Sequence, residues 1–119
     1  MGAHAAVAVE LGIPREIMNA ILADISSAGI EEKLRVIFQF IGKLTLTPHD
    51  ISQADADKVF AAGWDERALH DAIEVCALFN YMNRLVDGHG LQAEAASFQR
   101  EGSMLKDGYT PIIDVLGLK

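Results

Sequence analysis

The stretch that decides the fold runs from Ala68 to Gly90 and reads ALHDAIEVCALFNYMNRLVDGHG. It contains no proline, and its first glycine is Gly88. Apolar residues recur in it at steps of three and four, which is the spacing of one helix face, and further apolar residues occupy the other faces. A helix that is apolar over most of its circumference is usually buried among other helices. We therefore expect a central apolar helix over residues 68–87.

The length and composition of the chain indicate one acidic domain. Its 119 residues, 50% of them hydrophobic, can bury a core but are too few for two ordinary domains. The net charge of -7 argues against a nucleic-acid partner, because phosphate binding needs clustered lysine and arginine. No apolar run approaches the roughly 18 to 20 residues of a membrane span, and no basic region of a signal peptide precedes Arg15. The expected location is the cytoplasm, with no membrane partner.

The rest of the chain also has helical spacing. No segment alternates with a period of two over a useful length, so the fold class is all-α. We expect a single domain over residues 1–119, a bundle of about six helices in all, built around the central one. The other helices are expected at residues 1–11, 14–26, 31–44, 52–61 and 91–105, followed by a turn at 108–111 and a short apolar segment at 112–118.

Local signals mark several helix ends. Gly12 and Gly63 are expected to end helices, because glycine readily adopts the left-handed conformation that closes a helix. Asp50 or Ser52 can cap the helix that runs through Ala61, and Ser52 and Asp55 resemble a capping box with aspartate in the third position. Asp65 is expected to cap the central helix.

Four stretches, taken together and in this order, resemble one family. They are GAHAAVAVELGIP at 2–14, KLTLTP at 43–48, FNYMNRLVDG at 79–88 and GYTPIIDVLGL at 108–118. On these stretches the chain resembles the peroxidase-related branch of the carboxymuconolactone decarboxylase and AhpD-like alkylhydroperoxidase family. The resemblance implies an AhpD-like helical bundle built from a duplicated helical unit. It also implies a homo-oligomer, either a dimer, a trimer or a hexamer.

The resemblance further implies a thiol chemistry. The family site is Cys-x-x-Cys-x-x-x-His on a helix, with a glutamate upstream. One thiolate attacks the peroxide oxygen, and the resulting sulfenic acid condenses with the second cysteine. His4 matches the histidine of this motif, which would put both cysteines before Met1. We therefore expect one of two explanations. The chain is either an N-terminally truncated form, the C-terminal part of a longer protein, or a short family member without the cysteine pair.

Cys76 is the single cysteine of the chain, so no internal disulfide can form. It lies on the apolar face of the central helix without a histidine four residues away, and we expect a buried small hydrophobe rather than a nucleophile. His70 and Glu74 share a helix face, and His49, His89 and Asp87 are further metal-ligand candidates. A third ligand at a recognisable spacing is not evident, so we expect no metal site and no cofactor.

Asn80, Asn83 and Asp87 repeat the spacing of the missing motif as Asn-x-x-Asn-x-x-x-Asp. Together with Arg84 they form either a polar pocket that orients a ligand or water, or a buried hydrogen-bond network that fixes the turn at Gly88. The large aromatic residues are expected in the core, with a subunit contact as the alternative for the tryptophan. They are Phe38, Phe40, Phe60, Trp64 and Phe79.

Three functions follow from these observations. The resemblance implies thiol-dependent peroxide reduction in antioxidant defence, with a peroxide substrate and a dithiol reductant if a longer form exists. Without the cysteine pair, the chain as given is expected to be inactive in that reaction. The alternatives are a non-catalytic oligomeric module for ligand binding or interaction, and a lactone decarboxylase-like enzyme with His4 as proton donor or base.

Overall fold

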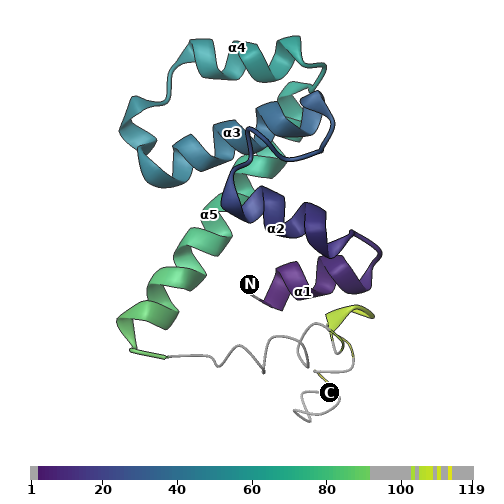
Figure 1. The fold of residues 1–119 in the computed structure, drawn as a ribbon. Coiled ribbons are helices and arrows are strands. Elements are labelled where there is room, and N and C mark those ends of the chain that lie inside the picture. The colour runs from purple at the N-terminus through teal and green to yellow at the C-terminus, as the bar shows by residue number, and fades with distance from the viewer. Residues whose placement is uncertain (1–2, 92–102, 104, 109, 111–112, 114–119) are drawn as a thin grey trace. The chain divides into compact units, whose positions relative to one another are not determined.

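The computed structural model describes residues 3–91, 103, 105–108, 110 and 113. Its elements are α1 (Ala3–Glu10), α2 (Arg15–Ala23), α3 (Glu32–Leu46), the 3-10 turn η1 (Pro48–Asp50), α4 (Gln53–Ala61) and α5 (Glu66–Gly88), as shown in Figure 1. The described residues contain helices and no strand, which confirms the all-α class. The helix expected at 91–105, the turn at 108–111 and the segment at 112–118 fall largely outside the described residues.

The chain divides into two compact units, and the division lies within α2. One unit comprises residues 1–19 and 92–119, and the other comprises residues 20–91. In the first unit α1 is followed by a turn at Gly12, whose φ of 104° is left-handed. The amide of Gly12 donates to Val9 O at 3.0 Å and that of Ile13 donates to Ala8 O at 3.0 Å. These two bonds satisfy carbonyls that the end of a helix would otherwise leave unpaired.

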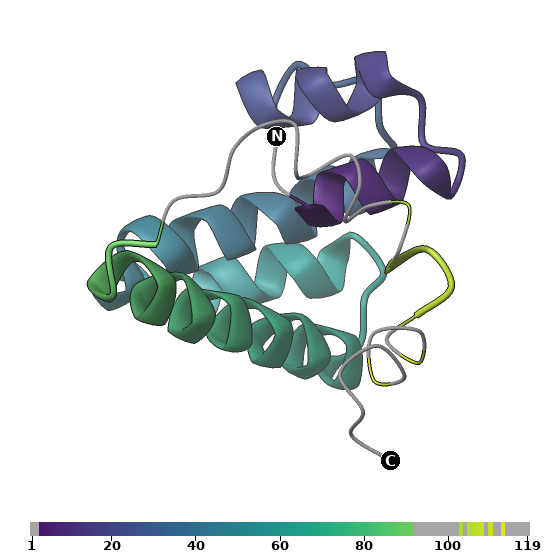
Figure 2. The ribbon, with the colours of Figure 1, turned by 90° about the horizontal axis from the view of Figure 1, so that it is seen from below.

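The unit of residues 20–91 is built on α3, which contacts α4, α5 and η1. Figure 2 shows α3, α4 and α5 lying side by side. Their shared core consists of four buried side chains, surrounded by partly buried apolar residues from the same helices. The four are Ile37, Phe40, Val59 and Leu69. Val59 is the most deeply buried of them, with 0% of its surface exposed.

Local capping fixes where α4 and α5 begin and end. The Asp55 carboxylate accepts from the backbone amide of Ser52 at 2.9 Å and from its hydroxyl at 2.8 Å. Asp65 accepts from the Ala68 amide at 2.7 Å, as expected for the cap of α5. Between the two helices Gly63 has a φ of 91°, and its amide donates to Phe60 O at 2.9 Å. The helix ends that local signals predict are therefore confirmed here.

The helices α3 and α5 run parallel, and a residue at the start or the end of α3 lies beside the residue 31 positions later in the chain. At their beginnings Trp64 Nε1 donates to Lys33 O at 2.8 Å, and near the end of α3 the Thr45 hydroxyl is hydrogen-bonded to Cys76 Sγ at 3.3 Å. Since α3 ends at Leu46, α5 continues beyond it. Every residue from 81 to 88 is exposed, and these eight residues extend α5 by about 12 Å.

The burial of α5 differs from the expected central helix. Only Leu69 and Cys76 of its residues are buried, although large apolar side chains occur all round it. The reason is that α3 and α4 pack on one side of α5 and reach along only part of its length. Two of the aromatic residues expected in the core, Phe38 of α3 and Phe79 of α5, are also exposed, whereas Phe40 is buried.

Candidate functional site

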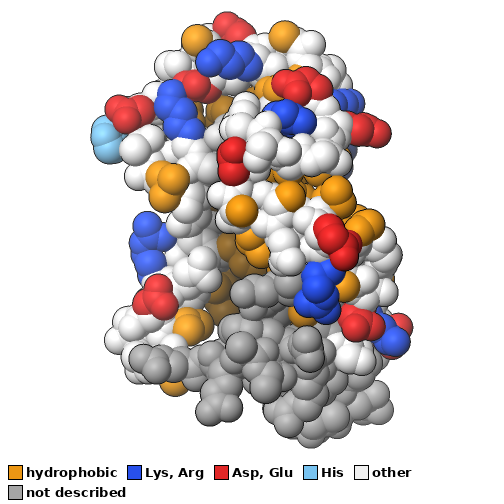
Figure 3. Space-filling model, in the orientation of Figure 1, with side chains coloured by type: hydrophobic (Ala, Val, Ile, Leu, Met, Phe, Trp, Pro, Cys, Tyr) orange, Lys and Arg blue, Asp and Glu red, His pale blue; other side chains and the backbone are white. Residues whose placement is uncertain are grey.

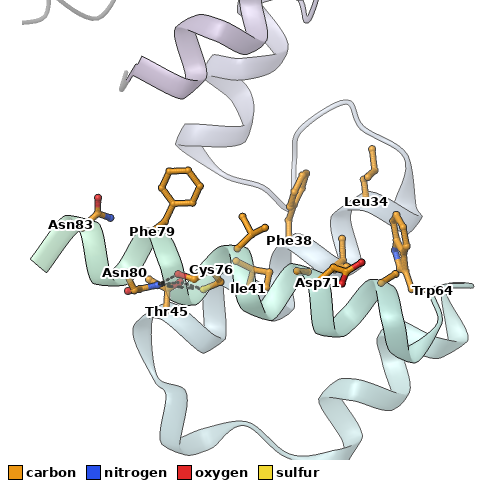
Figure 4. A pocket seen from close by; sticks show the side chains of 14 residues that line it. Leu34, Phe38, Ile41, Thr45, Trp64, Asp71, Cys76, Phe79, Asn80 and Asn83 are labelled. Carbon is orange, nitrogen blue, oxygen red and sulfur yellow. Dashed lines mark hydrogen bonds between the residues drawn. The ribbon is translucent and has the colours of Figure 1, made fainter. Parts of the chain in front are cut away.

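An open groove runs along one side of the contact between α3 and α5, from Trp64 to Asn83. It encloses a cavity of about 550 Å³, and its walls are mostly apolar. Figure 4 shows Leu34 and Trp64 at one end, Phe38 in the middle and Phe79 towards the other end. We call this cavity the α3–α5 groove. The side chains that line it from α3 are Leu34, Ile37, Phe38, Ile41 and Thr45, and those from α5 include Val75, Cys76, Phe79, Asn80 and Asn83.

Polar groups gather where α3 ends. The Asn80 amide donates through Nδ2 to Cys76 Sγ at 3.3 Å, to Cys76 O at 3.0 Å and to Thr45 Oγ1 at 3.4 Å. Thr45 and Cys76 are hydrogen-bonded to each other, so the three side chains form a closed cluster (Figure 4). Arg84 extends the cluster by donating through Nη1 to Asn80 O and Asn80 Oδ1, both at 3.0 Å.

The same three side chains also line a smaller cavity of about 250 Å³. Pro48, Ile73 and Arg84 complete parts of that wall. The Thr45–Cys76–Asn80 cluster therefore takes part in the walls of two cavities. Its hydrogen bonds link α3 to α5 at the point beyond which no helix of residues 20–91 packs against α5.

Cys76 is buried as expected, with 7% of its surface exposed. Its hydrogen-bond partners are a hydroxyl and an amide, and neither is a base that could accept the thiol proton. Nucleophilic cysteines act as thiolates and lie beside cationic or basic groups. This environment favours a structural role for Cys76 over a catalytic one.

The other predicted site residues are separated by the structure. Asn80 is partly buried in the cluster, whereas Asn83, Arg84 and Asp87 are exposed on the part of α5 beyond α3. The buried network expected for these four residues is therefore reduced to Asn80 and its contacts, because no helix of residues 20–91 covers the end of α5. His4 is exposed on α1, in the other unit.

The histidine and acidic residues form pairs on the surface. His70 Nε2 lies 3.3 Å from Glu74 Oε1, and His49 Nε2 lies 3.6 Å from Asp50 Oδ1. No set of three or more histidine, cysteine, aspartate or glutamate side chains within the described part of the chain is arranged to hold a metal ion. These pairs have the character of solvated helix-surface contacts.

A second polar site, which the sequence did not indicate, lies between α3 and α4. Lys43 Nζ is 2.7 Å from Asp55 Oδ2, and both residues line a cavity of about 560 Å³. The Lys43 ammonium, together with the Ser52 hydroxyl and amide, holds the pKa of Asp55 well below its usual range. In the sequence, residues 43–48 attract notice only as one of the four stretches that carry the family resemblance. This stretch contains both Lys43 and Thr45.

The surface of residues 20–91 has no large area of one charge on the face that Figure 3 shows. Acidic and basic side chains are interspersed over α3 and α4. None of the helices in the described ranges combines the length and the apolar character needed to cross a bilayer. Comparisons with protein-family models, with curated proteins and with solved structures find no significant match, so the family resemblance stays a prediction.

Proposed function

We propose that this chain is a peroxidase-related, AhpD-like protein whose described helices provide the scaffold of a thiol-dependent peroxidase rather than its reactive centre. The observation that supports this most directly is a contact between two of the four stretches that carry the resemblance. Asn80 in residues 79–88 donates to Thr45 in residues 43–48 at 3.4 Å. A specific hydrogen bond between two of these stretches gives a structural reason for finding both of them in one family.

The chemistry explains why the reactive centre is assigned elsewhere. Two-cysteine peroxide reduction breaks the peroxide O–O bond, forms a sulfenic acid on one sulfur and then a disulfide with the second sulfur, with release of water. A dithiol reductant restores the two thiols. The chain contains one cysteine, and the partners of its buried thiol among the described residues are the Thr45 hydroxyl and the Asn80 amide, neither of which is a base. His4 would assist this chemistry only beside a cysteine pair.

The test is peroxide consumption with dithiothreitol as reductant, for the wild-type chain and for Cys76→Ser. Both are expected to match the rate without protein. Turnover by the wild-type chain that disappears in Cys76→Ser would refute the structural role of Cys76. Turnover that survives this substitution would show a reaction centre outside the cysteine chemistry.

The DNA upstream of Met1 provides an independent test of the family. An open frame with a cysteine codon directly before Met1, and a second one three codons earlier, would support the peroxidase assignment. The longer protein should then consume peroxide, and replacement of either cysteine should abolish this activity. An in-frame stop codon there would count against the peroxidase assignment and favour a second candidate function, a non-catalytic module.

The α3–α5 groove favours that second candidate, a non-catalytic oligomeric module for ligand binding or interaction. An apolar cavity with a few polar groups at one end is the usual form of a binding site. Replacing Phe38, which lines the groove and is exposed, should weaken binding without unfolding the core. Phe38→Ser would test this against Leu46→Ser, a change of an exposed residue outside the groove.

A further inference from the structure

The exposed side of α5 has the pattern of a helix that pairs with another helix. Six large apolar side chains follow one another at steps of three, one, three, three and one, and each leaves between 39% and 59% of its surface exposed. This is the spacing of positions a, d and e in a heptad repeat. We call these residues the α5 seam: Val75, Leu78, Phe79, Met82, Leu85 and Val86.

The seam is distinct from the side of α5 that packs in the core. Leu69, Ile73 and Cys76 face α3 and α4, whereas the seam lies roughly a quarter to a half turn away on a helical projection. Its C-terminal half lies beyond the end of α3. Burial within residues 20–91 therefore does not account for its apolar character.

The exposed area is close to what an interface requires. Six side chains of about 150 to 200 Å² each, roughly half exposed, leave roughly 500 Å² of apolar surface in water. Leu34 and Phe38, on the opposite wall of the α3–α5 groove, are also exposed and add roughly 150 Å². A standard protein interface takes about 800 Å² from each partner.

We propose that the α5 seam and the adjoining α3–α5 groove form the interface between two copies of this chain, with the two α5 helices antiparallel about a twofold axis. This proposal rests on the oligomeric module described above and names its partner. A twofold interface brings the same surface of each copy together, so an apolar seam meets an equally apolar one. The groove beside the seam then receives side chains of the partner helix.

Charge determines the direction of pairing. Asp71 continues the seam line at a d position one heptad, or two turns, before Leu78, and His89 occupies an a position one heptad after Met82. Parallel pairing in register would place Asp71 opposite a second Asp71, and like charges in contact oppose association. Antiparallel pairing centred on the seam places Asp71 beside residues 89–90 of the other copy instead.

The test is the molar mass in solution by light scattering, with Leu78→Asp and Leu46→Asp as a matched pair. Leu78 lies in the seam, whereas Leu46 is a leucine outside it with 82% of its surface exposed. The wild-type chain and Leu46→Asp should be dimers at micromolar concentration, and Leu78→Asp should raise the dimer dissociation constant at least about 100-fold. Leu85→Asp should behave like Leu78→Asp, and circular dichroism should show that each variant keeps its helices.

A wild-type monomer at high micromolar concentration would overturn the proposal, as would equal mass changes in Leu78→Asp and Leu46→Asp. A wild-type monomer whose melting temperature falls in Leu78→Asp would indicate that another part of the same chain covers the seam. Neither result affects the peroxide assay, so the failure of this proposal is distinguishable from that of the proposed peroxidase family.

Disulfide formation tests separately whether the two α5 helices pair in the antiparallel direction. Val75→Cys and Val86→Cys, each in a Cys76→Ser background, should form a mixed disulfide with each other when oxidised together. Neither should form a disulfide with itself at a comparable rate. Rapid disulfide formation by each variant with itself would refute the antiparallel arrangement.

Discussion

Replacing Arg35 by lysine should destabilise the protein although it keeps the charge. The Arg35 guanidinium holds the turn between α2 and α3 by three hydrogen bonds to backbone carbonyls. Nη1 donates to Ser26 O at 2.6 Å, and Nη2 donates to Ala28 O at 3.1 Å and to Ile30 O at 3.2 Å. Ala28 is almost fully buried within this turn. A lysine ammonium lacks the planar fork that reaches three carbonyls at once.

The expected magnitude follows from these bonds. A hydrogen bond from a charged donor contributes about 1.5 to 3 kcal/mol, and lysine should retain one of the three. The Ser26 carbonyl is exposed and can bind water instead, so the loss concerns chiefly the partly buried carbonyls of Ala28 and Ile30. We expect Arg35→Lys to lower the free energy of unfolding by about 2 kcal/mol, which corresponds to roughly 10 °C in the melting temperature.

Urea and thermal unfolding followed by circular dichroism measure this effect. The control is Arg67→Lys, because Arg67 Nε lies 4.0 Å from Asp71 Oδ2 on the surface of α5 and its side chain is 89% exposed. The control should change the free energy of unfolding by less than about 0.5 kcal/mol. Hydrogen exchange should accelerate in residues 24–30 of Arg35→Lys alone. Equal destabilisation by the two substitutions would refute the tethering role of Arg35.

Three further predictions concern the core, the α3–α4 ion pair and the cysteine. Val59→Ala removes two buried methyl groups and should lower the free energy of unfolding by about 2 kcal/mol in urea titrations, with an unchanged m value. Asp55→Asn should lower the free energy of unfolding at neutral pH, because Lys43 depresses the pKa of Asp55 in the folded state. The difference in unfolding free energy between wild type and variant should shrink as the pH falls below about 4, because the wild-type carboxylate then becomes protonated and loses its contribution. The Cys76 thiol should react with a disulfide reagent about 100-fold faster in denaturant than in the folded state, and a fast reaction in buffer would contradict its burial.

Helix ends could be predicted from sequence because their signals are local. Gly12 and Gly63 adopt the left-handed conformation expected of them, and Asp65 caps α5. The pairing of Ser52 with Asp55 was likewise visible in four consecutive residues. Each of these features depends on atoms within one helical turn, so a single sequence contains the information.

The burial of α5 could not be predicted in the same way. Apolar residues occupy most of its circumference, so periodicity alone does not select the face that packs. That choice depends on the length of α3, which ends beside Asn80 and leaves Asn83 and Asp87 exposed. Thr45 was missed as a partner of Cys76 because 31 residues separate the two in sequence and only the parallel packing of α3 and α5 brings them together.

The indole of Trp64 makes the start of the α3–α5 contact visible to spectroscopy. It is the single tryptophan of the chain, its Nε1 donates to Lys33 O at 2.8 Å, and the Lys33 ammonium lies 4.2 Å from the ring centroid. A cation above the ring and a hydrogen bond at its nitrogen both perturb the excited state of an indole. The emission of this one fluorophore therefore reports separation of the two helices at their N-terminal ends, without an added label.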